Sequence, residues 1–171
     1  AHVPDINDFV RGFSFLLKPD GVATFENPHL LNLVEKNQFD TVYHEHYSYL
    51  SLTSVNKIFQ SNDLMIFDVE ELPSHGGSLR YYAQHTKTGV HPVSNRVELM
   101  ARKEFLAGLS TKKFYNGFQE RANQVKYDLL NFLILAKSDG KKVVAYGAAA
   151  KGNTLLNFAG VREVSAIVPI T

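Results

Sequence analysis

The sequence predicts a mixed α/β protein made of two small units, and three observations support this prediction. A helix-periodic stretch, a tight turn and a β-rich run follow one another over residues 5–27. Two further β-rich runs flank a Pro/Gly turn at residues 73–77. Near the end of the chain, residues 141–170 read as a strand, a glycine-bounded turn, a helix and a last β-run. Helices and strands that alternate in this way are typical of layered α/β folds.

Residues 5–17 form the first predicted helix, with Asp5 as a suitable N-cap. Its apolar residues recur at helical spacing: Ile6, Phe9, Val10, Phe13, Leu16 and Leu17. The sequence Lys-Pro-Asp-Gly at 18–21 ends this helix, because Pro and Asp-Gly favour turns. A short strand is then expected at residues 22–27, closed by Pro28.

The middle of the chain predicts two helices and an antiparallel pair of strands. Residues 30–36 are apolar enough for a short helix, and Thr53 or Ser54 is the expected cap of a second helix. The β-rich runs 64–72 and 78–85 are separated only by the short turn, so we expect them to be antiparallel neighbours.

After residue 86 the composition shifts to a long polar stretch with helical period. This stretch spans residues 92–139, is interrupted near 108–111 and is ended by Gly140. The strand, helix and strand that follow form a predicted βαβ unit. We therefore expect a boundary near residues 86–95, with one domain at 1–86 and a second at 87–171.

Composition excludes several classes of protein. The 171 residues include 18 Lys and Arg against 17 Asp and Glu, and this near-neutral charge argues against a binder of nucleic acid or membrane surfaces. The absence of cysteine excludes disulfides, Cys-ligated zinc and thiolate nucleophiles in this chain. The apolar run 129–136 is far shorter than a membrane span, and the start AHVPDINDF does not resemble a signal peptide. We expect a cytoplasmic protein.

The most unusual segment is Tyr-His-Glu-His-Tyr-Ser-Tyr at residues 43–49, hereafter the His46 segment. Histidine titrates near neutral pH, and a carboxylate such as Glu45 can orient it, so this segment is a candidate source of a general base. If the segment is extended, His44 and His46 share one face, while Tyr43 and Glu45 lie on the other.

Two other interpretations of the His46 segment remain open. In the first, the segment is an exposed loop whose aromatic rings only pack against their surroundings. In the second, His44 and His46 ligate one metal ion, as in a hydrolase. No third or fourth ligand is evident nearby, however, and the His-Glu-x-x-His spacing of zinc proteases is absent. We assign no metal ligands.

A second candidate site follows the predicted strand 141–147, where Gly147, Lys151, Gly152 and Asn153 lie at the start of a helix. Helix N-termini attract phosphate. The spacing nearly matches a phosphate-binding P-loop, but Asn153 stands where the lysine belongs, so an ATPase or GTPase is not expected. The turn either holds a phosphate-bearing ligand together with Lys151 or needs glycine only for its shape.

A third candidate site is Ser-His-Gly-Gly-Ser at residues 74–78, hereafter the SHGGS turn. Adjacent glycines permit a positive φ or the close approach of a ligand. Arg80, just beyond, is able to pair with a phosphate or a carboxylate. A plain hairpin turn explains the same residues equally well.

Four segments taken together resemble one family closely. They are AHVPDINDF, LKPDGVATFENPHLLNLVEKNQFDTVYHEHYSYLSL, LPSHGGSLRYY and VVAYGAAAKGNTLLNFAG, in this order along the chain. They resemble the S-adenosylmethionine-dependent sugar C-methyltransferases, which act on nucleotide-linked 4-keto-deoxysugars. In that chemistry the ketone acidifies a neighbouring C–H, a base removes the proton, and the enolate attacks the methyl group of the cofactor.

The resemblance implies a three-part protein: a Cys-rich zinc module, a central Rossmann-like methyltransferase domain and a C-terminal α/β domain. Residues 1–86 are then the back half of the central domain, and residues 87–171 most of the C-terminal, nucleotide-sugar-binding domain. The zinc cysteines and the glycine-rich loop that grips S-adenosylmethionine are not recognisable in this chain. We therefore expect the chain alone to bind S-adenosylmethionine weakly and not to turn over.

The resemblance also assigns roles to single residues. His46 matches the catalytic base, Tyr43 and Glu45 line the site, and His2 matches a further active-site histidine. The residues expected to contact the nucleotide sugar are His75, Gly76, Gly77, Ser78, Arg80, Gly147, Lys151, Gly152 and Asn153. The alternative is a module that uses the same scaffold to bind a nucleotide sugar without chemistry.

Overall fold

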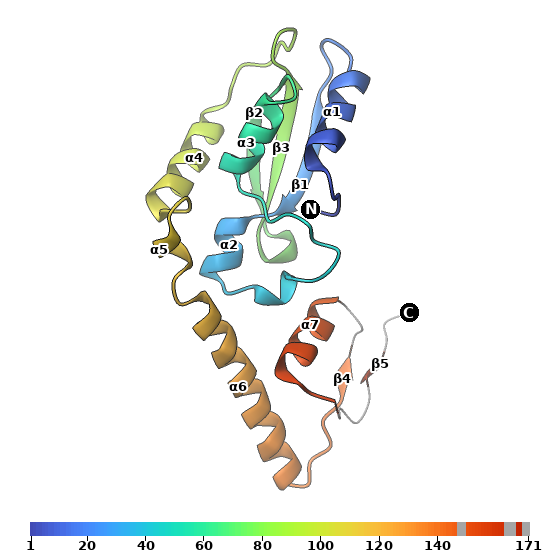
Figure 1. The fold of residues 1–171 in the computed structure, drawn as a ribbon, viewed down its shortest axis with the longest axis vertical. Helices are drawn as coiled ribbons and strands as arrows, with labels where there is room; N and C mark the ends of the chain where they lie inside the picture. The colour runs from blue at the N-terminus through green and yellow to red at the C-terminus, as the bar shows by residue number, and fades with distance from the viewer. Residues whose placement is uncertain (147–149, 163–166, 169–171) are drawn as a thin grey trace. The chain divides into compact units, whose positions relative to one another are not determined.

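The structure is a computed structural model that describes residues 1–146, 150–162 and 167–168 (Figure 1). The chain divides into two compact units. The first consists of Ala1–Lys36 and Glu45–Tyr115, and the second of Asn37–His44 and Asn116–Thr171.

The first unit contains a three-stranded antiparallel sheet. Its strands are β1 (Ala23–Pro28), β2 (Leu64–Leu72) and β3 (Ser78–His85). Their order is β1-β3-β2, so β3 is the central strand and is antiparallel to both neighbours. The pairing of β2 with β3 confirms the predicted hairpin, whose turn contains the short helix η2 (Ser74–Gly76). The mixed α/β class is thereby confirmed as well.

Five helices accompany this sheet: α1 (Ile6–Leu16), α2 (Leu30–Glu35), α3 (Leu52–Gln60), α4 (Asn95–Ala107) and α5 (Lys112–Tyr115). The carboxylate of Asp5 accepts a hydrogen bond of 2.9 Å from the Asp8 N–H, which confirms Asp5 as the N-cap of α1. The break between α4 and α5 falls at Gly108, within the interruption that the sequence predicts.

The predicted cap of α3 was wrong by two or three residues. Ser51, rather than Thr53 or Ser54, is the N-cap, and its side chain accepts a hydrogen bond from the Ser54 N–H. The Ser54 hydroxyl accepts a bond of 2.9 Å from the Ser51 N–H in return. This reciprocal pair satisfies two backbone donors at once, which is why it prevails over a single cap further along.

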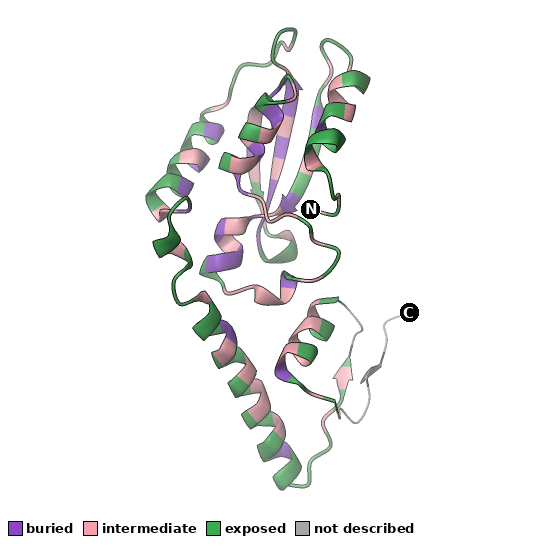
Figure 2. Ribbon diagram, viewed as in Figure 1, coloured by how far each residue is buried: buried purple, intermediate pink, exposed green. Residues whose placement is uncertain are grey.

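One face of the sheet is apolar and buried, and the other is polar. On β3, Leu79, Tyr81 and Ala83 are fully buried, whereas the alternate residues Arg80 and Tyr82 are half-buried. Helices cover the apolar face, and Figure 2 shows buried residues along the strands and on the inner sides of these helices. An antiparallel sheet with one solvated face shows this alternation. The core consists of Val10, Leu52, Val55, Phe59, Leu64, Ile66, Val69, Leu79, Tyr81, Ala83, Val97 and Met100.

The second unit contains η1 (Phe39–Thr41), α6 (Phe118–Ser138), β4 (Ala145–Tyr146), α7 (Ala150–Ala159) and β5 (Ile167–Val168). The strands β4 and β5 are parallel, with α7 between them in sequence, which confirms the predicted βαβ order. Of the predicted strand 141–147, β4 covers Ala145 and Tyr146, residues 141–144 are not in a strand, and residue 147 lies outside the described residues. The rings of Phe39 and Phe158 lie 5.1 Å apart and join η1 to α7.

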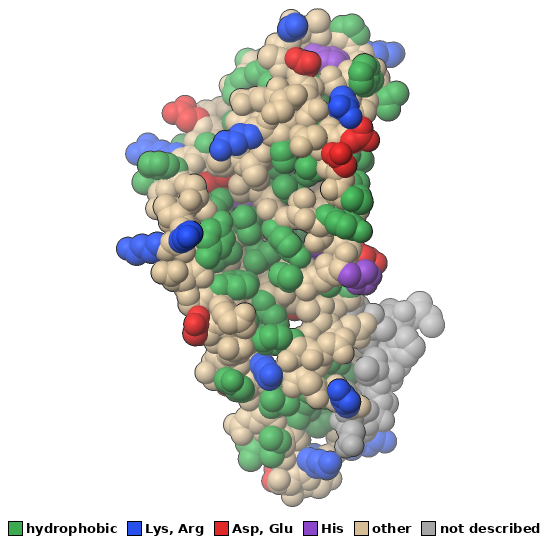
Figure 3. Space-filling model, in the orientation of Figure 1, with side chains coloured by type: hydrophobic (Ala, Val, Ile, Leu, Met, Phe, Trp, Pro, Cys, Tyr) green, Lys and Arg blue, Asp and Glu red, His purple; other side chains and the backbone are tan. Residues whose placement is uncertain are grey.

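Charged side chains are spread over the surface. Figure 3 shows Lys and Arg scattered among Asp, Glu and hydrophobic side chains, without a continuous basic patch on the face drawn. In the part of the chain that the structure describes, no helix combines the length and the apolar character that crossing a membrane requires.

Candidate functional site

The His46 segment is irregular rather than extended. It contains a turn at His44 and Glu45, so the alternation of faces expected of an extended chain does not apply. The boundary between the two compact units falls inside the segment, with Tyr43 and His44 in the second unit and Glu45 and His46 in the first. Glu45 is exposed and His46 is half-buried.

The structure brings His46 and His2 together. Their imidazole rings are stacked, with centroids 4.9 Å apart and planes inclined by 15°. Tyr49 lies next to this pair: its ring centroid is 6.2 Å from that of His46, and the two ring planes are inclined by 80°. A hydrogen bond of 2.8 Å from the Tyr47 N–H to the Ala1 carbonyl holds the two stretches of backbone side by side. Two histidines that are distant in sequence therefore form one cluster.

A pocket of about 240 Å³ adjoins this cluster, because His2 is one of its lining residues. Its polar groups come from Glu26, Asn27 and Tyr81. Burial, reinforced by the charge of Glu104, raises the pKa of Tyr81 far above its ordinary value, so its hydroxyl stays protonated. The remaining lining is mostly apolar: Ala1, Val3, Ile6, Phe9, Val10, Phe25, Leu50, Val55, Ile58 and Phe59.

In the SHGGS turn, polar side chains are engaged within the protein. The carboxylate of Glu26 accepts hydrogen bonds from the Ser74 hydroxyl at 2.6 Å and from the Arg80 guanidinium at 2.9 Å. The bond from Ser74, followed by that from Arg80, lowers the pKa of Glu26. The Ser78 hydroxyl donates to the Ser74 carbonyl at 3.0 Å. Arg80, expected to face a substrate anion, is paired with an acid of its own sheet.

The glycines of the turn have a packing role. Gly77 has a φ of 127°, and a Cβ at this position would lie 2.5 Å from the side-chain nitrogen of Asn32. The Gly77 carbonyl accepts a bond of 3.0 Å from the His29 N–H, and the Gly76 carbonyl one of 2.9 Å from the Lys36 ammonium. The close packing of the turn against α2 is a sufficient reason for glycine here.

The third candidate site is described only in part. Gly147 lies outside the described residues, whereas Lys151, Gly152 and Asn153 lie in the first turn of α7. Lys151 is half-buried, and the other two are exposed.

A buried hydrogen-bonded pair, His29 and Glu104, is not apparent from the sequence. His29 Nε2 lies 2.8 Å from Glu104 Oε1, and both side chains are almost fully buried. A signal for Glu104 was present, because it continues the helical spacing of Val97 and Met100, the buried apolar positions of α4. A carboxylate in such a stripe must be paired inside the fold.

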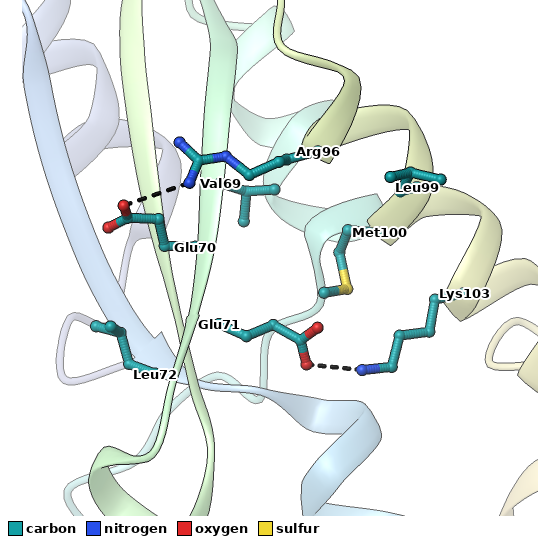
Figure 4. A pocket seen from close by; sticks show the side chains of 8 residues that line it. All are labelled: Val69, Glu70, Glu71, Leu72, Arg96, Leu99, Met100 and Lys103. Carbon is teal, nitrogen blue, oxygen red and sulfur yellow. Dashed lines mark hydrogen bonds and ion pairs between the residues drawn. The ribbon is translucent and has the colours of Figure 1, made fainter.

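A groove between β2 and α4 is a weaker candidate for a ligand site. Figure 4 shows that its charged side chains face one another: Arg96 contacts Glu70, and Lys103 contacts Glu71 at 2.6 Å. Its cations are thus already paired with carboxylates. Among the residues that the structure describes, no three His, Asp or Glu side chains cluster as metal ligands would.

Comparison with known proteins gives the family. Residues 73–169, more than half of the chain, match the family of C-methyltransferase C-terminal domains, so the chain belongs to this C-methyltransferase family. It is also 38% identical over 161 residues, or 94% of its length, to the C-methyltransferase NovU of Streptomyces niveus. The chain covers 38% of the length of that relative. The resemblance drawn from the four sequence segments is confirmed.

Proposed function

We propose that this chain is the acceptor-binding and proton-transfer part of a longer C-methyltransferase, which methylates a carbon of a nucleotide-linked keto-deoxysugar. Membership of the family supports methyl transfer, and the length of NovU supports a longer parent. The observation that carries the chemistry is the stacked pair of His2 and His46 beside a largely apolar pocket.

The proposed role of His46 is to remove a proton from the carbon next to the keto group. Histidine is the side chain that most often acts as a general base near neutral pH, and an imidazole suits the removal of a proton from an activated carbon acid. The C–H electron pair moves into the enolate, and the proton moves to His46. His2 orients the imidazole of His46, while Tyr43 and Glu45 line the acceptor site.

Two features of the first unit argue against a glycine-rich loop for S-adenosylmethionine at these places. The β1–α2 connection consists of His29 and has no glycine, and Gly77 of the SHGGS turn packs against Asn32. We therefore assign no step of the cofactor to these residues. In our proposal, S-adenosylmethionine and any zinc module belong to other segments of the parent protein.

Residues 1–86 are proposed to complete a Rossmann-like methyltransferase domain in that parent. The order β1-β3-β2 leaves β1 at an edge of the described sheet, where a further strand can pair. Residues 87–171 are proposed to bind the nucleotide sugar, with Lys151 on α7 close to its phosphates.

Replacing His46 tests the proposal. In the complete protein that contains this chain, we expect His46→Ala to lower kcat for methyl transfer by about 10²- to 10⁴-fold, the usual contribution of a general base. The matched control is His44→Ala, an exposed histidine two residues away, which should change kcat by less than about threefold. Loss of methyl transfer with retained binding of the nucleotide sugar would support the role of His46, whereas unchanged methyl transfer in His46→Ala would refute its assignment as the base.

A further inference from the structure

The carboxylate of Glu104 accepts four hydrogen bonds inside the first unit. It lies on α4 and is 1% exposed. Its Oε1 accepts hydrogen bonds from His29 Nε2 at 2.8 Å and from the Leu52 N–H at 2.6 Å. Its Oε2 accepts bonds from the Thr53 N–H at 2.9 Å and from the Thr53 hydroxyl at 2.5 Å. Four donors thus converge on one buried group.

These donors keep Glu104 ionised. Burial by itself raises the pKa of this carboxyl, but the hydrogen bonds from His29 and Thr53 outweigh burial, and the pKa falls below its ordinary value. The positive end of the α3 dipole acts in the same direction, because Leu52 and Thr53 are the first residues of that helix. A buried carboxylate held in this way gives a rigid, directional contact.

The donors to Glu104 belong to segments that adjoin the stretch of chain carrying His46. The first two residues of α3 follow directly on the stretch that carries His46. The carbonyl of Leu50, in this stretch, accepts a bond of 2.9 Å from the Leu30 N–H. His29, whose side chain reaches Glu104, donates its backbone N–H to Gly77 of the SHGGS turn at 3.0 Å. Glu104 therefore connects α4, α3, the start of α2 and the turn.

We propose that Glu104 is a positioning residue for the methyl-transfer reaction, and this inference rests on the proposed function of His46. By fixing the start of α3, the carboxylate anchors residues 45–53 at their far end and keeps His46 stacked on His2. In this proposal, the Glu104 side chain makes no contact with the acceptor. Its effect is transmitted through the backbone between His46 and α3, and misplacing a reacting group by about 1 Å can lower a rate 10²-fold.

The test is Glu104→Gln in the complete protein, because the amide has the shape of the carboxylate. Its NH2 group would face a backbone N–H in place of an acceptor, so one donor of α3 loses its partner. We expect kcat to fall by about tenfold or more with KM for the acceptor nearly unchanged. Hydrogen exchange of residues 45–53, followed by mass spectrometry, should become faster.

The matched control is Val97→Ala. Val97 is buried on the same helix, and its apolar side chain cannot form a hydrogen bond to the first turn of α3. It should destabilise the fold through a cavity but leave kcat and the exchange of residues 45–53 unchanged. If Glu104→Gln and Val97→Ala lose kcat in proportion to their loss of stability, Glu104 is only a structural residue and the proposal is overturned.

A milder pair of variants covers the case in which Glu104→Gln does not fold. Thr53→Ala removes one hydroxyl donor but keeps the backbone N–H, and it should lower kcat by about threefold. Thr53→Ser, which restores the hydroxyl, should restore kcat. Equal kcat in Thr53→Ala and the unmodified protein would contradict the role of this contact.

The two proposals fail in different ways. A His46→Ala variant with full turnover overturns the proposed function. The positioning role of Glu104 is then overturned as well, because it rests on that function. An inactive His46→Ala variant together with a fully active Glu104→Gln variant overturns the positioning role alone.

Discussion

The SHGGS turn and the cluster of His2, His46 and Tyr49 contain similar residue types, yet their side chains make different kinds of contact. In the turn, Ser74 and Arg80 both donate to Glu26, and Gly77 packs closely on Asn32. In the cluster, two imidazole rings stack beside a pocket that one of them lines. Residue types alone therefore do not determine which contacts a segment makes in the fold.

Among the variants that probe the difference between these two regions, we expect Gly77→Ala to have the largest effect, and this effect is on stability. The new Cβ would meet the Asn32 side chain at 2.5 Å, and a φ of 127° is strained for alanine. We expect the free energy of unfolding to fall by about 2–4 kcal/mol, measured by denaturant titration.

The control for this variant is Gly12→Ala in α1, where an added Cβ meets nothing within 4 Å. It should raise stability by up to about 1 kcal/mol, because alanine favours helix. A Gly77→Ala protein of normal stability would contradict the packing role of this glycine.

A smaller effect is expected at His2. If its ring orients His46 by stacking, His2→Ala should lower kcat about three- to tenfold, in keeping with the energy of an aromatic contact. His2→Phe keeps a flat ring and should recover most of the loss. Equal impairment of both variants, in the same steady-state assay, would mean that the imidazole nitrogens of His2 take part in the chemistry.

The smallest expected effect concerns Glu26, whose pKa is lowered by its bonds from Ser74 and Arg80. Because the folded pKa lies below the ordinary value of 4.5, the ionised form contributes stability at neutral pH. This contribution is lost as the pH falls through the folded pKa. Unfolding experiments on Glu26→Gln should show a flatter dependence of stability on pH in the acid range than the unmodified protein. Equal slopes would contradict the pairing.

Local features of the fold were predictable, whereas pairings between distant segments were not. The N-cap Asp5 and the hairpin of β2 and β3 depend on neighbouring residues, and both are confirmed. The order β1-β3-β2 depends on contacts between distant segments, which a single sequence does not display. The exposed turn at His44 was not predictable either, because the same residues are equally compatible with an extended segment and the surrounding fold decides between the two.

The candidate site was predictable to a similar extent. His46 is conspicuous within its segment, but His2 was selected only through the family resemblance, and the structure places their rings together. The pair of His29 and Glu104 is separated by 75 residues and spans the expected boundary at residue 86, so no local pattern joins the two. Only the position of Glu104 in an apolar stripe hints at its burial.

Removal of a carbon-bound proton by His46 can be observed through hydrogen exchange at the acceptor. The complete protein is incubated in deuterated water with a nucleotide-linked keto-deoxysugar, and the proton next to the keto group is followed by NMR. We expect enzyme-dependent loss of this signal, slowed by about 10²-fold or more in His46→Gln. Exchange at an equal rate in both proteins would contradict the account.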